Sequence, residues 1–210
     1  MICPLCKTDS SSKYSSDKTR DYFLCGLCDL VFVDREALIS IPDEKKRYDL
    51  HDNLEADSGY GIYLKKIADS ILPHLQDGQR GLDFGSGKTK RLAELLSPHE
   101  VESYDIFYHN DQTLLQRSYD FIILSEVIEH LREPMETMVF LNEILNPLGS
   151  FFIKTKLRPE TEERFSNWFY KRDITHIEFF SLKSLGFLSD RLGRKNLKQV
   201  GEDLFRISDH

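Results

Sequence analysis

The chain has 210 residues, of which 40% are hydrophobic and 30% charged, so it is long enough for one sizeable core and a small additional module. Its formal net charge of -7 argues against a broad nucleic-acid-binding surface, which normally carries clustered positive charge. No charged segment followed by an apolar one opens the chain, and no apolar run approaches the roughly 18 residues of a membrane-spanning helix. We therefore expect a cytoplasmic protein.

All four cysteines lie in the first 28 residues, in two Cys-x-x-Cys pairs: Cys3, Cys6, Cys25 and Cys28. This spacing is typical of a four-thiolate zinc site, and four thiolates leave no coordination position open, so the expected Zn²⁺ is structural. Disulfides are the alternative, which a reducing cytosol disfavours. We predict a zinc ribbon over residues 1–35, with β segments at 22–24 and 30–33 and a polar, turn-rich stretch over 10–18.

A helical connector is expected over residues 36–59, because Pro42-Asp43-Glu44 is typical of a helix start. From residue 60 to residue 75, apolar side chains recur at helical spacing, which predicts an amphipathic helix packed on a sheet.

Residues 81–87, Gly-Leu-Asp-Phe-Gly-Ser-Gly, predict a buried strand and a glycine turn, with a helix following at 92–96. The glycines let the backbone come close to a ligand, and the helix start offers free N–H groups. A second strand near 101–104 ends at Asp105, about 20 residues on, where dinucleotide-binding folds place an acidic residue on the ribose hydroxyls. Together these features predict a nucleotide-cofactor site.

Strands and helices continue to alternate towards the C-terminus, which implies a doubly wound α/β sheet. The expected elements are a strand at 121–124, a helix at 135–145, a turn at 147–149, a strand at 151–153, a helix at 182–192 and two antiparallel edge strands at 197–200 and 204–207.

Residues 60 to 207 resemble the class I S-adenosylmethionine-dependent methyltransferases. The resemblance rests on the glycine motif at 82–87, on Asp105, on the strand and exit loop at 119–131 and on the turn at 145–149. It implies a Rossmann-like, doubly wound sheet of the seven-stranded type over residues 60–210, with S-adenosylmethionine as cofactor. The residues that it implies for cofactor binding are Asp83, Gly85, Ser86, Gly87, Asp105, Ser125 and Glu126.

Two departures from the family pattern stand out. Thr89 follows Lys88 where a third glycine is usual, and the interval between Asp105 and Tyr119 is short, which suggests a trimmed third strand. Residues 109–112 are the candidates for the adenine pocket.

Zinc-ribbon cysteines ahead of such a domain are also seen in some sugar C-methyltransferases and in certain ribosomal-RNA methyltransferases. The whole chain is thus similar to a small bacterial-type zinc-ribbon methyltransferase, and we expect a small-molecule acceptor. RNA methylation, with the ribbon docking the RNA, is one alternative, for which the ribbon supplies Lys7, Lys13, Lys18 and Arg20. A binding protein that has lost catalysis is another. A nucleoside-triphosphatase and a dehydrogenase fit the residues around the glycine turn less well.

Methyl transfer needs an aligned acceptor and, for an oxygen or carbon acceptor, a base. His176 is the first candidate base, because residues 168–181 resemble the segment that forms part of the acceptor pocket in these enzymes. His130, at the carboxyl end of a buried strand, is the second. A structural hydrogen-bonding role is the alternative for both.

Overall fold

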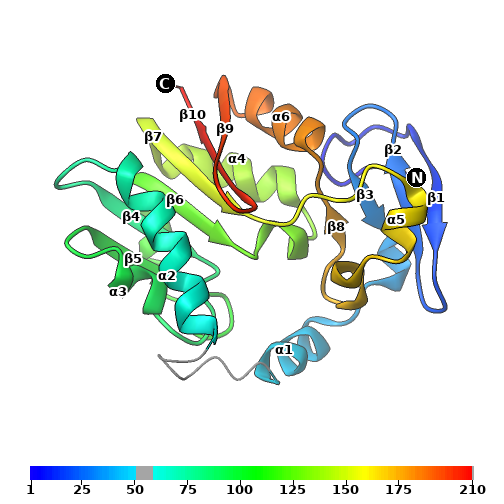
Figure 1. Cartoon of the computed structure of the whole chain (residues 1–210), viewed down its shortest axis with the longest axis horizontal. Coiled ribbons are helices and arrows are strands. Elements are labelled where there is room, and N and C mark those ends of the chain that lie inside the picture. Colours follow the sequence, from blue (N-terminus) through cyan, green and yellow to red (C-terminus); the bar gives the residue numbers. More distant parts are fainter. Residues whose placement is uncertain (51–58, 210) are drawn as a thin grey trace.

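The computed structural model describes residues 1–50 and 59–209. The larger sheet has six strands, in the order β5 (Glu100–Tyr104), β4 (Arg80–Phe84), β6 (Tyr119–Ser125), β7 (Leu145–Lys154), β10 (Leu204–Ser208) and β9 (Asn196–Gly201) (Figure 1). The first four strands are parallel, whereas β10 is antiparallel to both β7 and β9. The sheet is therefore mixed and mostly parallel.

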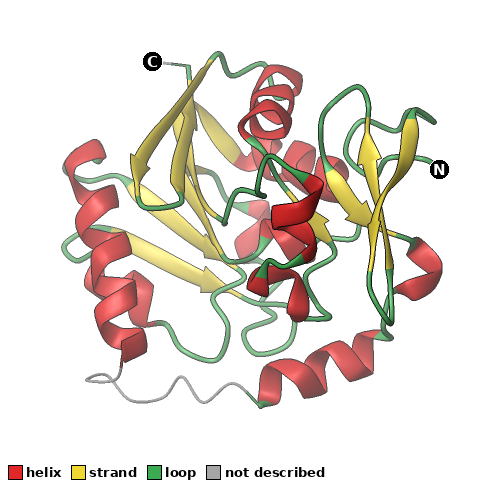
Figure 2. Ribbon diagram, turned by 45° about the vertical axis from the view of Figure 1, so that its right-hand side comes forward, coloured by secondary structure: helices red, strands yellow, loops and turns green. Residues whose placement is uncertain are grey.

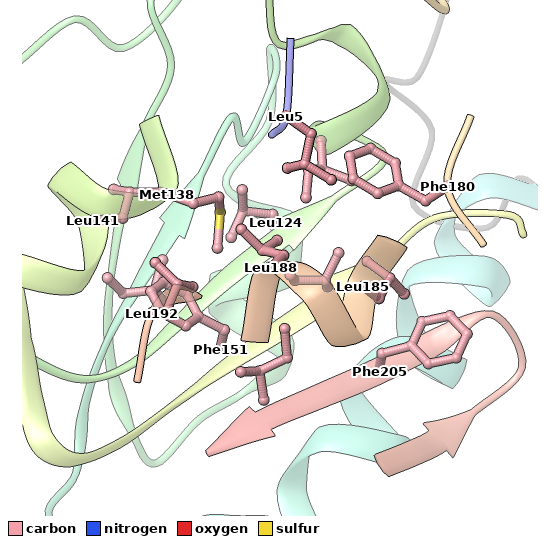
Figure 3. Packing of buried hydrophobic residues seen from close by; sticks show 14 of the residues in the cluster. Leu5, Leu124, Met138, Leu141, Phe151, Phe180, Leu185, Leu188, Leu192 and Phe205 are labelled. Carbon is pink, nitrogen blue, oxygen red and sulfur yellow. The ribbon is translucent and has the colours of Figure 1, made fainter. Parts of the chain in front are cut away.

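Helices cover both faces of this sheet. They are α2 (Gly59–Ile71) and α3 (Arg91–Leu95) on one face, and α4 (Pro134–Ile144) and α6 (Leu182–Arg191) on the other. Within β6, Phe121 and Ile123 pack with α2 and α3, whereas Ile122 and Leu124 pack with α4 and α6. The continuous apolar run of this strand is thus explained by burial on both sides. Figure 3 shows Leu124 among the side chains of α4 and α6.

A second, smaller sheet holds the N-terminal residues. Its strands are β1 (Ser11–Ser16), β2 (Asp21–Cys25), β3 (Val31–Val33) and β8 (Glu178–Phe179), in that order and all antiparallel (Figure 2). The last strand comes from far along the chain, so the sheet is completed by residues outside the N-terminal segment. The Val33 amide also donates to the Ile177 carbonyl oxygen at 2.9 Å. The division into 1–35, 36–59 and 60–210 stays a prediction.

The remaining helical segments connect these layers. They are α1 (Ile41–Asp49), α5 (Glu162–Ser166) and five short 3₁₀ turns: η1 (Arg35–Ala37), η2 (Leu72–His74), η3 (Leu114–Gln116), η4 (Ile128–His130) and η5 (Phe169–Arg172). The Ser40 hydroxyl caps α1 by accepting from the Asp43 amide, and Pro42 occupies the first turn. A reciprocal capping box between Ser181 and Ser184 begins α6. No helix in the described parts of the chain has the length and apolar character needed to cross a membrane.

Three expectations need correction. Within residues 1–50 and 59–209 the sheet has six strands rather than the seven of the expected type, because residues between Asp105 and Tyr119 form only η3 and no strand. Residues 11–16 form β1 rather than a turn-rich stretch, since pairing with β2 satisfies the backbone of a polar edge strand. Residues 147–149 lie within β7 and not in a turn; there the Arg194 guanidinium donates to the Gly149 carbonyl oxygen at 2.9 Å.

Candidate active site

A cavity of about 590 Å³ opens where β4, β5 and β6 reach their carboxyl ends. In α/β sheets this edge is the usual place for ligands. The structure brings all the cofactor-binding and catalytic candidates from the sequence to the lining of this one cavity: Asp83, Gly85, Ser86, Gly87, Asp105, Ser125, Glu126, His130 and His176. Their individual roles stay predictions.

The glycine turn after β4 has a backbone that only glycine adopts easily. Gly85 has φ +78° and Gly87 has φ +69°, both in the left-handed region. A Cβ on Gly85 would lie 2.5 Å from Cγ2 of Val127, so the close packing there also needs glycine. The amides of Gly85 and Ser86 donate to the Tyr104 carbonyl oxygen at 2.8 and 3.1 Å, which fixes the turn to the end of β5.

Asp105 ties this turn to the loop that follows β5. Its Oδ2 accepts from the Gly87 amide at 2.9 Å, and its Oδ1 accepts from the amides of Phe107 and Tyr108 at 2.8 and 3.1 Å. The carboxylate is therefore held in one orientation at the cavity wall.

Asp83 is buried beneath the turn and has no hydrogen bond to a described residue. Burial, and then the negative charge of Asp105, raise the pKa of its carboxyl to about 7. An unsatisfied buried carboxyl beside a glycine cradle fits a site that receives a polar or cationic ligand.

Aromatic side chains that the sequence did not single out form much of the remaining wall. Tyr48 comes from α1, Tyr60 and Tyr63 come from the first turns of α2, and Phe107 and Tyr108 follow β5. Tyr60 and Tyr63 are three residues apart in α2 and therefore share one helix face, which was the local sequence signal for this wall. Residues 109–112, the expected adenine-pocket candidates, do not line this cavity.

His130 and His176 lie side by side, with ring centroids 4.7 Å apart. Nδ1 of His130 is 2.9 Å from the Thr175 carbonyl oxygen, and Nδ1 of His176 is 2.7 Å from that of Tyr170. A carbonyl oxygen can only accept, so each Nδ1 carries a hydrogen and each neutral ring has its lone pair on Nε2. Burial lowers the pKa of both imidazoles, that of His130 to about 3, so both are neutral at pH 7.

Two carboxylates share the hydroxyl of Tyr170 beside these rings. The hydroxyl lies 2.6 Å from Oε2 of Glu126 and in closer contact with Oε1 of Glu129. Glu126 also accepts from the Tyr63 hydroxyl at 2.8 Å. Glu129 is fully buried, and burial together with the Glu126 charge raises the pKa of its carboxyl well above the usual range. From the sequence, Glu129 either assists the neighbouring His130 or is a solvated side chain; the structure buries it, and its contact with Tyr170 was not predictable because Tyr170 comes from a distant segment.

The aromatic residues of segment 168–181, which resembles part of the acceptor pocket in the family, lie elsewhere. Trp168, Phe169, Tyr170, Phe179 and Phe180 do not line the cavity. Phe179 and Tyr170 instead pack with Tyr22 of the N-terminal sheet. Tyr170 and Phe179 therefore join the two parts of the chain rather than forming the cavity wall, whereas Phe169 is exposed.

The four cysteines form a separate cluster away from the cavity. Their sulfur atoms all lie within 4.8 Å of one another, with Cys3 and Cys28 at 3.5 Å and Cys6 and Cys25 at 3.4 Å. No disulfide joins them. Sulfurs at about 2.3 Å from one tetrahedral Zn²⁺ lie roughly 3.8 Å apart, so the donor set fits zinc.

The basic residues that could dock RNA are largely engaged within the chain. Lys7 pairs with Glu136 at 2.8 Å and Lys13 with Asp21 at 2.9 Å. Arg20 is buried.

Residues 60–199 match the model of a family described as a methyltransferase domain. The chain belongs to this family. One similar solved structure is an O-methyltransferase family protein from Burkholderia thailandensis, with 14% identity and a TM-score of 0.52 over 78% of this chain and 61% of that one. Another is the 1,6-didemethyltoxoflavin N1-methyltransferase of the same organism, with 15% identity and a TM-score of 0.53 over 94% of this chain and 98% of that one.

The second of those structures holds 1,6-didemethyltoxoflavin and S-adenosylhomocysteine. At these identities the likeness shows a shared methyltransferase fold. The chain spans less than two thirds of the first structure's length. No curated protein matches the chain.

Proposed function

We propose that this member of the methyltransferase-domain family transfers a methyl group from S-adenosylmethionine to a small molecule. The observation that carries the proposal is the convergence of the glycine turn, Asp105 and Glu126 from three neighbouring strands on one cavity of about 590 Å³. When bound, S-adenosylmethionine supplies a methyl group activated by a sulfonium. The structurally similar 1,6-didemethyltoxoflavin N1-methyltransferase, whose structure holds S-adenosylhomocysteine and 1,6-didemethyltoxoflavin, supports both parts of the proposal.

Different residues would hold different parts of the cofactor. Asp83 and the turn at 85–87 serve the methionine portion, where the open space beside Gly87 admits a close ligand. Asp105 serves the ribose hydroxyls, and its bonds to three amides keep its carboxylate oriented before the ligand arrives. Ser125 and Glu126 lie at the end of β6, on the side of the cavity that leads to the two histidines.

The acceptor would bind towards His130 and His176. An oxygen or carbon acceptor must lose a proton, and a neutral imidazole is a suitable base. His176→Ala is then expected to abolish turnover while S-adenosylhomocysteine binds with nearly unchanged affinity. Normal turnover would remove His176 from the mechanism.

The cofactor site is tested by calorimetric titration with S-adenosylhomocysteine. We expect micromolar affinity in the native sequence and a loss of at least tenfold in Asp105→Ala. Asp69→Ala is the matched control, because Asp69 lies on the exposed side of α2 and, among the described residues, pairs with Lys65 alone. Thermal melts of both variants separate a lost contact from a lost fold. Absence of binding at millimolar ligand would favour a methyltransferase-like binding protein without catalysis.

We also propose that the four cysteines bind one structural Zn²⁺ and that the protein works in the cytoplasm, where thiols stay reduced. Support comes from the closed cluster of four unbonded sulfurs. Elemental analysis of protein purified without chelator is expected to give one zinc ion per chain, and Cys28→Ser should lower that ratio. A zinc-free native protein that remains folded would contradict the zinc site.

A further inference from the structure

A second group of possible metal ligands lies at the wall of the cavity, which His130 and His176 line, while Glu129 is fully buried beside them. Glu129, His130 and His176 each offer one ligand atom, and the three atoms lie within 4.8 Å of one another. Ligand atoms at about 2.1 Å from a tetrahedral ion lie roughly 3.4 Å apart, so small side-chain rotations would bring all three onto one ion. The three residues come from η4 and from the segment after η5, which β8 fixes to the N-terminal sheet.

Both histidines are already arranged as ligands. Metal-bound histidines nearly always donate the hydrogen of the other ring nitrogen to a carboxylate, a carbonyl or water. Here each Nδ1 donates to a backbone carbonyl oxygen, of Thr175 and of Tyr170 respectively. Neither Nε2 has a hydrogen bond to a described residue, so both lone pairs are available for an ion.

The charge balance of the cluster also calls for a proton or a cation on Glu129. The Tyr170 hydroxyl has one hydrogen, yet it faces both Glu126 and Glu129, so it can satisfy only one carboxylate at a time. The second oxygen of Glu129, Oε2, is fully buried and has no hydrogen-bond partner among the described residues. Lys154, at 3.5 Å, neutralises Glu126 rather than Glu129. A buried, unpaired carboxylate is costly unless a proton or an ion compensates it.

We propose that Glu129, His130 and His176 form a binding site for a divalent transition-metal ion. Two imidazoles and one carboxylate suit Mn²⁺, Fe²⁺, Co²⁺ or Zn²⁺ better than Ca²⁺ or Mg²⁺, which prefer oxygen ligands alone. Three protein ligands leave positions open, in contrast to the four cysteines, whose site is closed. The two proposed metal sites therefore differ in their ligands and in their open coordination positions: the cysteine site is structural, whereas the site at the cavity can bind a further ligand.

An open metal position facing the cavity points to an oxygen acceptor, a conclusion that rests on the proposed methyltransferase function. A bound ion lowers the pKa of a hydroxyl that coordinates to it, so in the metal-loaded protein the ion replaces the base proposed above and the two histidines serve as its ligands. In the transfer, the acceptor oxygen loses its proton to solvent and bonds to the methyl carbon. The electron pair of the broken carbon–sulfur bond stays on sulfur, and the sulfonium becomes a thioether.

Manganese titration of protein that carries one zinc ion per chain, so that zinc fills the cysteine site alone, is followed by the electron paramagnetic resonance signal of free Mn²⁺ and tests the site without turnover. Manganese is the probe because thiolates bind it weakly. We expect one Mn²⁺ per native chain. Glu129→Gln and His176→Gln should each weaken binding more than tenfold. His74→Gln, on a histidine of η2 remote from the cluster, is the matched control and should bind as the native chain does.

The same variants are titrated with S-adenosylhomocysteine, which separates this proposal from the preceding one and reports on folding. Retained cofactor affinity with lost Mn²⁺ binding supports the metal site. Cofactor binding by the native chain with no Mn²⁺ bound at millimolar metal overturns the metal site alone. Mn²⁺ binding that persists in both cluster variants overturns it too, because the ion then lies elsewhere. Mn²⁺ binding without cofactor affinity supports the site and contradicts the proposed function.

Discussion

Replacing Arg20 by alanine should destabilise the contact between the N-terminal sheet and the segment that carries His176. The Arg20 side chain is buried, and its guanidinium donates to the carbonyl oxygens of Ile174 at 3.1 Å and His176 at 3.0 Å. It also donates to those of Asp173, at 3.3 Å, and Lys171. One side chain thus holds four backbone carbonyls of a segment about 150 positions later in the chain.

The expected loss of stability follows from these bonds. A hydrogen bond from a charged donor contributes about 1.5–3 kcal/mol, and bonds to one group are not additive. Since water can reach some of the freed carbonyls, we expect Arg20→Ala to lower the free energy of unfolding by about 3 kcal/mol. For a chain of this size that corresponds to a fall in Tm of roughly 6–12 °C. Arg20→Lys should recover little, because an ammonium group cannot reach several carbonyls at once.

Urea unfolding of the zinc-loaded protein, followed by circular dichroism, measures this loss. Arg191→Ala is the control, because Arg191 is exposed at the end of α6, where its guanidinium lies 5.2 Å from the Phe187 ring centroid. Its cost should stay near 0.5 kcal/mol. An Arg20→Ala variant as stable as Arg191→Ala would refute the reasoning that this guanidinium joins the two parts of the chain.

Three further predictions concern the turn, the N-terminal sheet and the cysteines. Gly85→Ala should weaken S-adenosylhomocysteine binding at least tenfold in calorimetry, because its Cβ meets Val127 and its φ is +78°; unchanged affinity would contradict the close fit of the turn. Burial raises the pKa of Asp17, but hydrogen bonds from Tyr22, Thr19 and Arg20 outweigh burial and bring it below its usual range. The ionised Asp17 therefore contributes to stability above about pH 4, and this contribution is lost as the pH falls further. In urea unfolding, the native chain should exceed Asp17→Asn in free energy of unfolding by less in acid than at neutral pH. A difference that does not change with pH would contradict this. Cys28→Ser should lower the Tm measured in zinc-containing buffer, and an unchanged Tm would show that the ribbon does not need four thiolates.

The sequence predicted those elements whose signal is local. The apolar run of β6, the glycine turn after β4 and the acid after β5 can each be recognised from a few consecutive residues. Polar β1 escaped prediction because pairing with β2, and not its own composition, makes it a strand. Strand β8 has two residues, too few for any periodicity.

The site was predictable to a similar degree and for similar reasons. Asp105 and the glycines follow strands directly, so their shared edge could be inferred from strand order. Tyr48 could not be placed, because α1 reaches the cavity only through tertiary packing. Glu129 gains its significance from Tyr170, 41 positions later, and from His176, neither of which is near it in sequence.

The two sides of the cavity are held by different parts of the molecule. The cofactor side depends on hydrogen bonds among β4, β5 and Asp105, all within the large sheet. The histidine side depends on Arg20 and on pairing of β3 with β8, because His176 lies two residues before that strand. Loss of the proposed zinc should therefore disturb His176 more than the glycine turn. Cys28→Ser is then expected to weaken Mn²⁺ binding while leaving S-adenosylhomocysteine affinity close to that of the native chain. Equal losses of Mn²⁺ affinity and S-adenosylhomocysteine affinity would contradict this and show that the two sides of the cavity depend on the same contacts.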